Sequence, residues 1–238
     1  MRKNYAHLTF VLDNSGSMQH LKPKTLEGFN GFLRKQKALP GKLTTSLYQF
    51  TDVWAHGFGH IITSESLANI PVTVKETYNF VDVQQVPELT DENYSCDTNT
   101  PLLDAIGWAI DKTGEQLAAL KEDDRPESVT LVILTDGQEN HSYRYTKKQV
   151  FDKIKHQTEN YKWDVIYLAS GQDAIAVGAS FGISAASSMN YAANPASLTA
   201  SYNALGATLR SKRADANFVA SFDEDQRRTV LSGEEEEK

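Results

Sequence analysis

The sequence contains a single cysteine, Cys96, so no disulfide bond can form within the chain. Small secreted domains often depend on disulfides, whereas proteins of reducing compartments rarely contain them. The first residues, Met1 to Tyr5, lead almost directly into an apolar run and leave little room for a cleavable signal segment. We therefore expect a cytoplasmic protein.

Long hydrophobic runs are lacking as well. No apolar stretch approaches the roughly 18 residues that a membrane-spanning helix requires, so we expect no membrane partner. Positive charge is in deficit, because 24 Lys and Arg residues stand against 31 Asp and Glu residues and give a formal net charge of −7. Nucleic-acid binding needs clustered cations that displace phosphate counterions, and we therefore expect no nucleic-acid partner.

The composition that remains is typical of a globular protein, with 40% hydrophobic and 23% charged residues among 238. This length suffices for one large α/β domain or two small ones. Apolar runs alternate with segments of helical spacing, which predicts a mostly parallel sheet covered by helices on both faces. We expect strands at 8–12, 43–50, 129–134, 163–169 and 184–190, and helices at 23–37, 101–120, 147–160, 171–181 and 196–212.

The stretch 53–86 has a different pattern. It is rich in β-forming residues and is interrupted by Gly57, Gly59 and Pro71. This pattern predicts several short antiparallel strands rather than a helix. His56 and His60 also lie in this stretch, but two candidate ligands are too few for a zinc site.

A polar cluster, Asp13-Asn14-Ser15-Gly16-Ser17, follows the first apolar run. If that run is a buried strand, a carboxylate and two hydroxyls lie just beyond its end, and oxygens of this type suit a hard divalent cation. The same residue types are common in turns and helix caps, so the cluster alone leaves both interpretations open.

A second carboxylate, Asp136, follows the most hydrophobic run at 129–134 and precedes Gly137. Ligands of an open parallel sheet bind beyond the carboxyl ends of its strands. Asp13 and Asp136 therefore converge if their strands are neighbours. The loop that contains Asp97 and Thr100, directly before a long helix, is the best candidate for a third contribution to the same face.

Taken in order, these three elements resemble a von Willebrand factor type A domain with its metal-ion-dependent adhesion site. The resemblance covers about residues 6–212. It implies a Rossmann-like, mostly parallel sheet of about six strands with one antiparallel edge strand. The motifs that carry it are Asp13-x-Ser15-x-Ser17, then Thr100 in Thr-Pro-Leu-Leu-Asp-Ala-Ile, then Thr135-Asp136-Gly137.

The resemblance also implies one Mg²⁺ ion at the top of the sheet, with Mn²⁺ or Ca²⁺ as alternative ions. Ser15, Ser17 and Thr100 are the expected direct ligands. Asp13 and Asp136 are expected to act as charged partners through water. One departure concerns the loop before Thr100, since many members have glycines there and this chain has Thr98-Asn99.

A cation held by neutral hydroxyls stays electrophilic, so a further carboxylate can complete its coordination. We therefore expect a protein-binding module, an adaptor or assembly component, that captures an Asp or Glu side chain of a partner protein. We do not expect an enzyme. The sequence leaves the oligomeric state open.

Two other functions remain open at this stage. A metal-assisted hydrolase would need a general base near the metal-bound water, and His141, Glu139 or Asp97 could serve. A structural subunit of a larger phage or bacterial assembly would use the metal only to brace loops. Cys96 lies close to the expected site but has no evident histidine base, and we regard it as a bystander.

The expected organisation is a domain at residues 1–212 and a C-terminal extension at 213–238 that ends in the flexible acidic run Glu234–Glu237. Within the domain, residues 53–78 are interpreted as a β-rich insertion. If the second strand runs parallel to the first, this insertion emerges on the metal-bearing face. Our hypothesis is that it helps to select the partner, and a simple extension of the sheet edge is the alternative.

Overall fold

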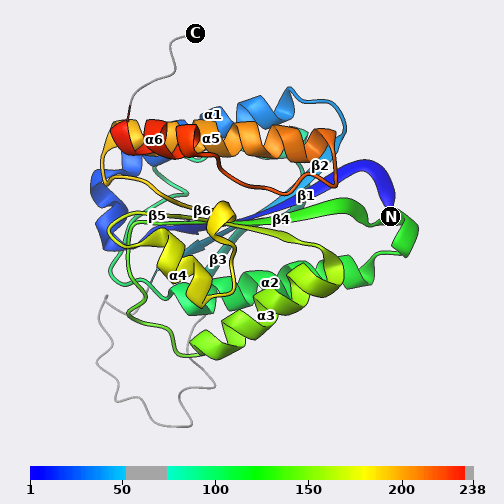
Figure 1. The fold of residues 1–238 in the computed structure, drawn as a ribbon, viewed down its shortest axis with the longest axis horizontal. Coiled ribbons are helices and arrows are strands. Elements are labelled where there is room, and N and C mark those ends of the chain that lie inside the picture. The colour runs from blue at the N-terminus through cyan, green and yellow to red at the C-terminus, as the bar shows by residue number, and fades with distance from the viewer. Residues whose placement is uncertain (52–73, 234–238) are drawn as a thin grey trace.

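Six strands form one sheet in the order β3-β2-β1-β4-β5-β6 in the part of the chain that the structure describes, residues 1–51 and 74–233 (Figure 1). The structure is a computed structural model. The strands are β1 (Arg2–Asp13), β2 (Lys42–Phe50), β3 (Val74–Asp82), β4 (Pro126–Thr135), β5 (Asp164–Ala169) and β6 (Ser188–Asn190). The helices are α1 (Lys22–Lys37), α2 (Leu102–Ala119), α3 (Lys147–Tyr161), α4 (Ala174–Ser180), α5 (Pro195–Ala214) and α6 (Glu224–Ser232).

All strand pairs are parallel except β2 with β3, which lies antiparallel at one edge of the sheet. β1 lies in the middle, where Thr9 is in register with Ser46 of β2 and Leu131 of β4. The expected fold, an open and mostly parallel sheet with one antiparallel edge strand and helices on both faces, is confirmed.

The helices divide between the two faces of the sheet. Helices α1, α5 and α6 cover one face, and α2, α3 and α4 cover the other (Figure 1). Each face of the sheet has its own hydrophobic core: the first core lies under α1, α5 and α6, and the second lies under α2, α3 and α4. Side chains of a strand alternate between faces, so Phe10 and Leu12 of β1 belong to the first core and Val11 belongs to the second. A strand buried on both faces has a continuous apolar run in its sequence, which is why β1 and β4 were predictable.

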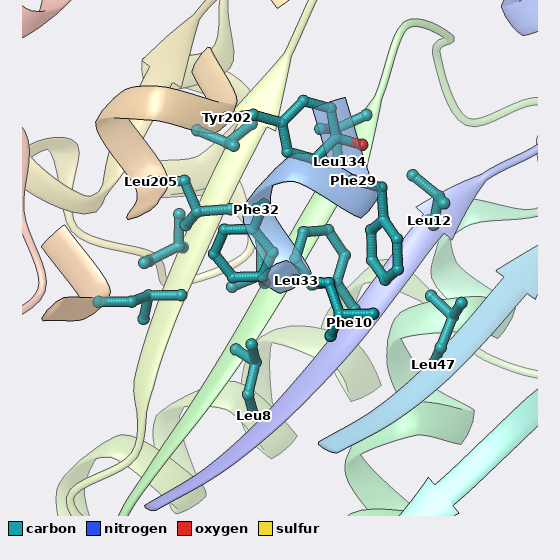
Figure 2. Close-up of a cluster of buried hydrophobic side chains, with 14 of the residues drawn as sticks. Leu8, Phe10, Leu12, Phe29, Phe32, Leu33, Leu47, Leu134, Tyr202 and Leu205 are labelled. Atoms are coloured by element: carbon teal, nitrogen blue, oxygen red, sulfur yellow. The ribbon is translucent and has the colours of Figure 1, made fainter. Parts of the chain in front are cut away.

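Aromatic side chains fill the centre of the first core (Figure 2). The ring of Phe10 lies edge-on to Phe29 at 5.3 Å and to Phe32 at 5.8 Å between centroids. All three are almost fully buried. Burial of each such side chain stabilises the fold by about 1.5–3 kcal/mol, so this cluster is a main reason that α1 stays on the sheet.

Helix ends follow the capping residues of the sequence. Thr146 and Gln149 form a capping box at the start of α3, and Asn194 caps α5 directly before Pro195. Among residues 1–51 and 74–233, no helix combines the length and the apolar character needed to cross a membrane.

The stretch 53–86, from which several short strands were expected, is described only from residue 74 onward. There a single strand, β3, runs from Val74 to Asp82 and continues into a 3₁₀ turn at Val83–Gln85. Residues 74–78, counted from the sequence as the end of an insertion, therefore belong to the edge strand of the main sheet. The rest of the expected insertion, and His56 and His60, lie outside the described residues.

Residues 213–233, expected as an extension, continue the same globule up to Gly233. Phe222 and Val230 are buried in the first core together with α1 and α5. The buried amine of Lys212 lies 2.6 Å from Asp164 of β5 and donates to the carbonyl of Ala216, which holds the connection between α5 and α6. The acidic run Glu234–Glu237 lies outside the described residues.

Close packing of α1 against α5 depends on Gly28, and this gives a first prediction. A Cβ atom at Gly28 would lie 2.3 Å from Cδ2 of the buried Tyr202, whereas one at Gly31 meets nothing nearer than 3.9 Å. We expect Gly28→Ala to lower the free energy of unfolding by about 1–3 kcal/mol through overpacking. Gly31→Ala, the matched control in the same helix, should raise it by about 0.5–1 kcal/mol. Urea unfolding measures both, and equal effects would contradict the packing argument.

His7 of β1 is a buried titratable group outside the expected site. It is 1% exposed, its Nδ1 and Nε2 lie 2.9 and 3.1 Å from the hydroxyls of Thr44 and Thr9, and its ring stacks on Phe80. Burial lowers the pKa of His7 to about 3 from 6.5. The imidazole is therefore neutral in the folded protein at neutral pH.

A second prediction follows from this difference in pKa. Between pH 6.5 and about 3 the unfolded chain binds a proton at His7 that the folded chain does not, so acid favours unfolding. We expect His7 to cost about 2 kcal/mol of stability at pH 5 relative to neutral pH. Urea unfolding of wild type, His7→Gln and the exposed control His156→Gln at both pH values tests this. His7→Gln should lose less unfolding free energy between neutral pH and pH 5 than wild type, whereas His156→Gln should lose as much as wild type. An equal loss in His7→Gln and wild type would contradict the prediction.

Candidate metal centre

The expected site residues lie at the carboxyl ends of the two central strands. Asp13 is the last residue of β1, and Asp136 directly follows Thr135, the last residue of β4. β1 and β4 are paired in parallel, with Leu12 in register with Leu134. The two strand ends therefore lie side by side, which is the arrangement that the sequence required for convergence.

Asp13 is fully buried and its carboxylate is held on both sides. Its Oδ1 accepts a hydrogen bond from the backbone N–H of Ser15 at 2.7 Å, and its Oδ2 accepts one from the Thr135 hydroxyl at 2.5 Å. Burial raises the pKa of Asp13 to about 6, while the bonds from Thr135 and Ser15 lower it and the nearby Asp136 raises it. The carboxylate is thus fixed in orientation and poorly solvated.

A chain of oxygens leads from Ser15 to Asp136. The hydroxyls of Ser15 and Ser17 lie 3.1 Å apart, and the Ser17 hydroxyl donates to Oδ1 of Asp136 at 2.5 Å. Burial raises the pKa of Asp136, and the Ser17 bond and the charge of His20 oppose that shift. The structure therefore brings both serines and the second carboxylate together from two separate strand ends.

Thr100 reaches the same turn by a different route. A Cβ atom at Gly137 would lie 2.7 Å from the Thr100 hydroxyl oxygen, so that side chain packs directly on the residue after Asp136. Thr100 is 3% exposed, and its N–H donates to the side chain of Asn140 at 2.8 Å. Only a glycine at position 137 permits this close approach.

The loop before Thr100 is bound to the end of β1. The N–H of Asp97 donates to the carbonyl of Asn14 at 2.9 Å, and the N–H of Gly16 donates to the carbonyl of Thr98. The buried Tyr94 hydroxyl also donates to the carbonyl of Asp13, at 2.6 Å. These bonds explain how a loop without glycines is still drawn to the site.

The oxygens of this cluster fit a hard divalent cation in kind. Two carboxylates and three hydroxyls come from three loops, and Mg²⁺ prefers oxygen ligands of this type. Within residues 1–51 and 74–233 there is no group of three or more His, Cys, Asp or Glu side chains that could hold a metal ion.

Two carboxylates hold the loop that follows Asp136. Asp104 of α2 accepts hydrogen bonds from the three N–H groups of residues 143–145. Glu139 accepts from the N–H groups of Leu103, His141 and Ser142 and from the Ser142 hydroxyl, at 2.7–2.9 Å. Glu139 thus anchors this loop to the first turn of α2.

Sequence reasoning missed three contributors. Thr135 was visible inside the Thr-Asp-Gly motif, but its bond to Asp13 depends on the pairing of the two strands. His20 Nδ1 donates a 2.7 Å hydrogen bond to the Ser17 carbonyl, and no local pattern indicates this contact. Asp104 lies in the quoted Thr-Pro-Leu-Leu-Asp segment, where its position in the first turn of a helix was the available signal.

Cys96 behaves as a bystander would. It is half-buried beside the first core, and burial raises the pKa of its thiol to about 11. A nucleophilic cysteine needs a thiolate, and this environment favours the neutral thiol.

The bond from Thr135 to Asp13 gives a third prediction. Thr135→Val preserves the shape of the side chain but leaves Oδ2 of a buried carboxylate without its donor, which costs about 1–3 kcal/mol. Thr135→Ser keeps the hydroxyl and serves as the matched control. We expect urea unfolding at pH 7 to show a large loss for Thr135→Val and a small one for Thr135→Ser. Similar losses would assign the effect to packing instead.

Comparisons with known proteins add information on the fold. No family model matches the sequence, and no curated protein matches it significantly. Two structures of proximal thread matrix protein 1 from the mussel byssus, each 11% identical, align with TM-scores of 0.53 and 0.50 and cover 88% and 85% of this chain. They cover 47% and 46% of the mussel chains, so this chain spans about half the length of the structures it matches.

A von Willebrand factor type A structure from Catenulispora acidiphila is 13% identical and aligns over 87% of this chain and 42% of its own, with a TM-score of 0.45. That alignment is too loose to carry an argument. The two mussel structures show a shared α/β fold and, at this identity, nothing about function.

Proposed function

We propose that this chain is a protein-interaction module that holds a divalent cation, Mg²⁺, beyond the ends of β1 and β4 and captures a carboxylate of a partner protein. Ser15, Ser17 and Thr100 are the proposed direct ligands, and Asp13 and Asp136 act through water. The observation that carries the proposal is the continuous contact of oxygens from Ser15 through Ser17 to Asp136.

The chemistry of these oxygens favours capture of an anion. A bound Mg²⁺ would supply Lewis acidity to a sixth oxygen, because neutral hydroxyl ligands leave its charge largely uncompensated. The chain's own part is to present preorganised oxygens. Asp13 is fixed by Thr135 and by the N–H of Ser15, so little ordering is needed when a ligand arrives.

A binding role is proposed in preference to a metal-assisted hydrolase. Two of the three candidate bases, Glu139 and His141, form other contacts. Glu139 accepts four hydrogen bonds from its own loop and from α2, and His141 Nε2 lies 2.6 Å from the Tyr143 hydroxyl. The raised pKa of the Cys96 thiol also disfavours a cysteine nucleophile. Mn²⁺ and Ca²⁺ remain alternative ions, and cytoplasmic placement remains a prediction from the single cysteine.

The role of residues 53–78 in partner selection also stays a proposal. Residues 52–73 lie outside the described residues. The strands that flank them support the idea, since Phe50 at the end of β2 is in register with both Asp13 and Val74. The segment therefore leaves and re-enters the fold at the metal-bearing edge of the sheet.

A fourth prediction concerns the metal alone. A ligand that binds only the folded state stabilises it by about 2.7 kcal/mol at one hundred times its Kd, so Mg²⁺ should raise the melting temperature by several degrees relative to chelator. Asp13→Asn and Ser15→Ala should abolish this shift. Asp123→Asn removes the same charge from an exposed turn before the amino end of β4, at the opposite end of that strand from Asp136, and should preserve the shift. Equal shifts in all variants would place the ion elsewhere, and no shift in wild type would remove the basis for metal-dependent capture.

A further inference from the structure

A cleft of about 420 Å³ opens beside the proposed metal site, between the first turn of α2, the loop after β4 and helix α4. Both helices lie on the same side of the sheet (Figure 1). Leu102, Leu103, Val177 and Phe181 supply its apolar walls. A cavity of this size accepts a large side chain or a small ligand.

The carboxylates that line the cleft are hydrogen-bonded within the protein, whereas the amine at its rim forms no ion pair with a described residue. The carboxylates of Glu139 and Asp173 both line it, but each is bound to backbone N–H groups, in the case of Asp173 those at the start of α4. The amine of Lys147 lies over the Phe181 ring at 5.8 Å. In the described part of the chain no carboxylate forms an ion pair with Lys147, so the positive charge at this rim is available to an anion.

The cleft and the metal site share one loop. Gln172, which lines the cleft, donates to the carbonyl of Gly137 at 2.9 Å and contacts the Tyr167 hydroxyl. Gln138 and Glu139, also in the lining, follow Gly137 directly in the chain. A partner segment whose carboxylate binds the proposed metal beside Asp136 would therefore pass the mouth of the cleft within a few residues.

We propose that this cleft receives a large apolar side chain of the same partner segment that supplies the carboxylate to the metal, next to a second acidic group that pairs with Lys147. The inference rests on the proposed function and defines its partner as an acidic segment with an adjacent apolar anchor. In an extended segment, residues i and i+2 point to the same side about 7 Å apart, which suits a carboxylate and an anchor on one face.

In this arrangement the carboxylate at the metal provides attraction, and the apolar anchor in the cleft provides selectivity. Every protein that exposes Asp or Glu offers a carboxylate that a metal could bind, so coordination alone gives little selectivity. An apolar anchor that fills a pocket beside it excludes water and distinguishes one segment from another. Lys147 then favours acidic over basic neighbours of the anchor.

The test uses the full chain, immobilised in millimolar Mg²⁺, and a random-decapeptide library displayed on phage. Phage released by chelator are sequenced, and the most enriched peptide is synthesised. We expect the released pool to contain an Asp or Glu within a few residues of Leu, Phe, Tyr or Trp. A pool enriched in acidic residues without an apolar one, as in the chain's own Glu234–Glu237, would overturn the inference.

Matched variants locate the anchor. Val177→Trp fills the cleft and should lower the affinity for the synthetic peptide at least tenfold. Lys147→Glu should lower that affinity several-fold. Two control variants should leave the affinity within twofold of wild type. One is Ile175→Trp, in the same helix as Val177 but outside the cleft lining, and the other is Lys148→Glu, the residue after Lys147 in α3 and also outside the lining. Equal affinities for Val177→Trp and Ile175→Trp would overturn the inference.

The outcomes separate this inference from the function on which it rests. Chelator-dependent binding that Val177→Trp does not weaken leaves metal-dependent capture intact and removes the cleft from it. A library that yields no chelator-released peptide contradicts both. Melting curves of each variant in Mg²⁺ show whether the fold and the metal response survive the substitution, so a loss of binding is assigned to the cleft only where both are retained.

Discussion

The parallel pairing of β1 with β4 is the constraint on which the rest of the site depends. Because Leu12 and Leu134 are in register, Asp13 and Thr135 end their strands side by side, and the Thr135 hydroxyl can donate to the Asp13 carboxylate. The same carboxylate accepts the N–H of Ser15 and so sets the course of the loop that carries both serines. One buried anion thus ties together two strand ends and the oxygens beyond them.

Such an anion destabilises the fold that holds it. Burial raises the pKa of Asp13 to about 6, and a hydrogen bond from a neutral hydroxyl offsets only part of the cost of desolvating a carboxylate. An apolar residue at the end of a fully buried strand would be the more stable choice. Buried, imperfectly compensated charge tends to persist where it serves a function, and a cation shared with Asp136 would supply the missing compensation.

Much of the fold and the site was predictable from the sequence because it follows from periodicity and topology. Buried strands such as β1 and β4 have apolar runs as their sequence signal, and a parallel sheet brings their carboxyl ends to one edge, so the sequence predicts that Asp13 and Asp136 meet if their strands are neighbours. Only the structure supplies that pairing. Helix α6 was not predictable, since Val230 is its one fully buried side chain and its apolar stripe is short. The role of Glu139 was also hidden, because its partners at Leu103 and Ser142 depend on how α2 docks against the loop.

The cleft beside the site was hidden for the same reason. Its walls come from α2 and α4, which are far apart in sequence, and each contributes apolar residues that look like ordinary core. Their position would decide what the proposed metal site can recognise. A bound cation would attract any exposed carboxylate, so selectivity would have to come from the surface next to the proposed site. Here that surface joins an apolar recess to the amine of Lys147, and the loop that forms its rim also carries Asp136. A partner that bound both the proposed metal and the cleft would therefore be distinguished by the residue beside its acidic group as much as by the acidic group itself.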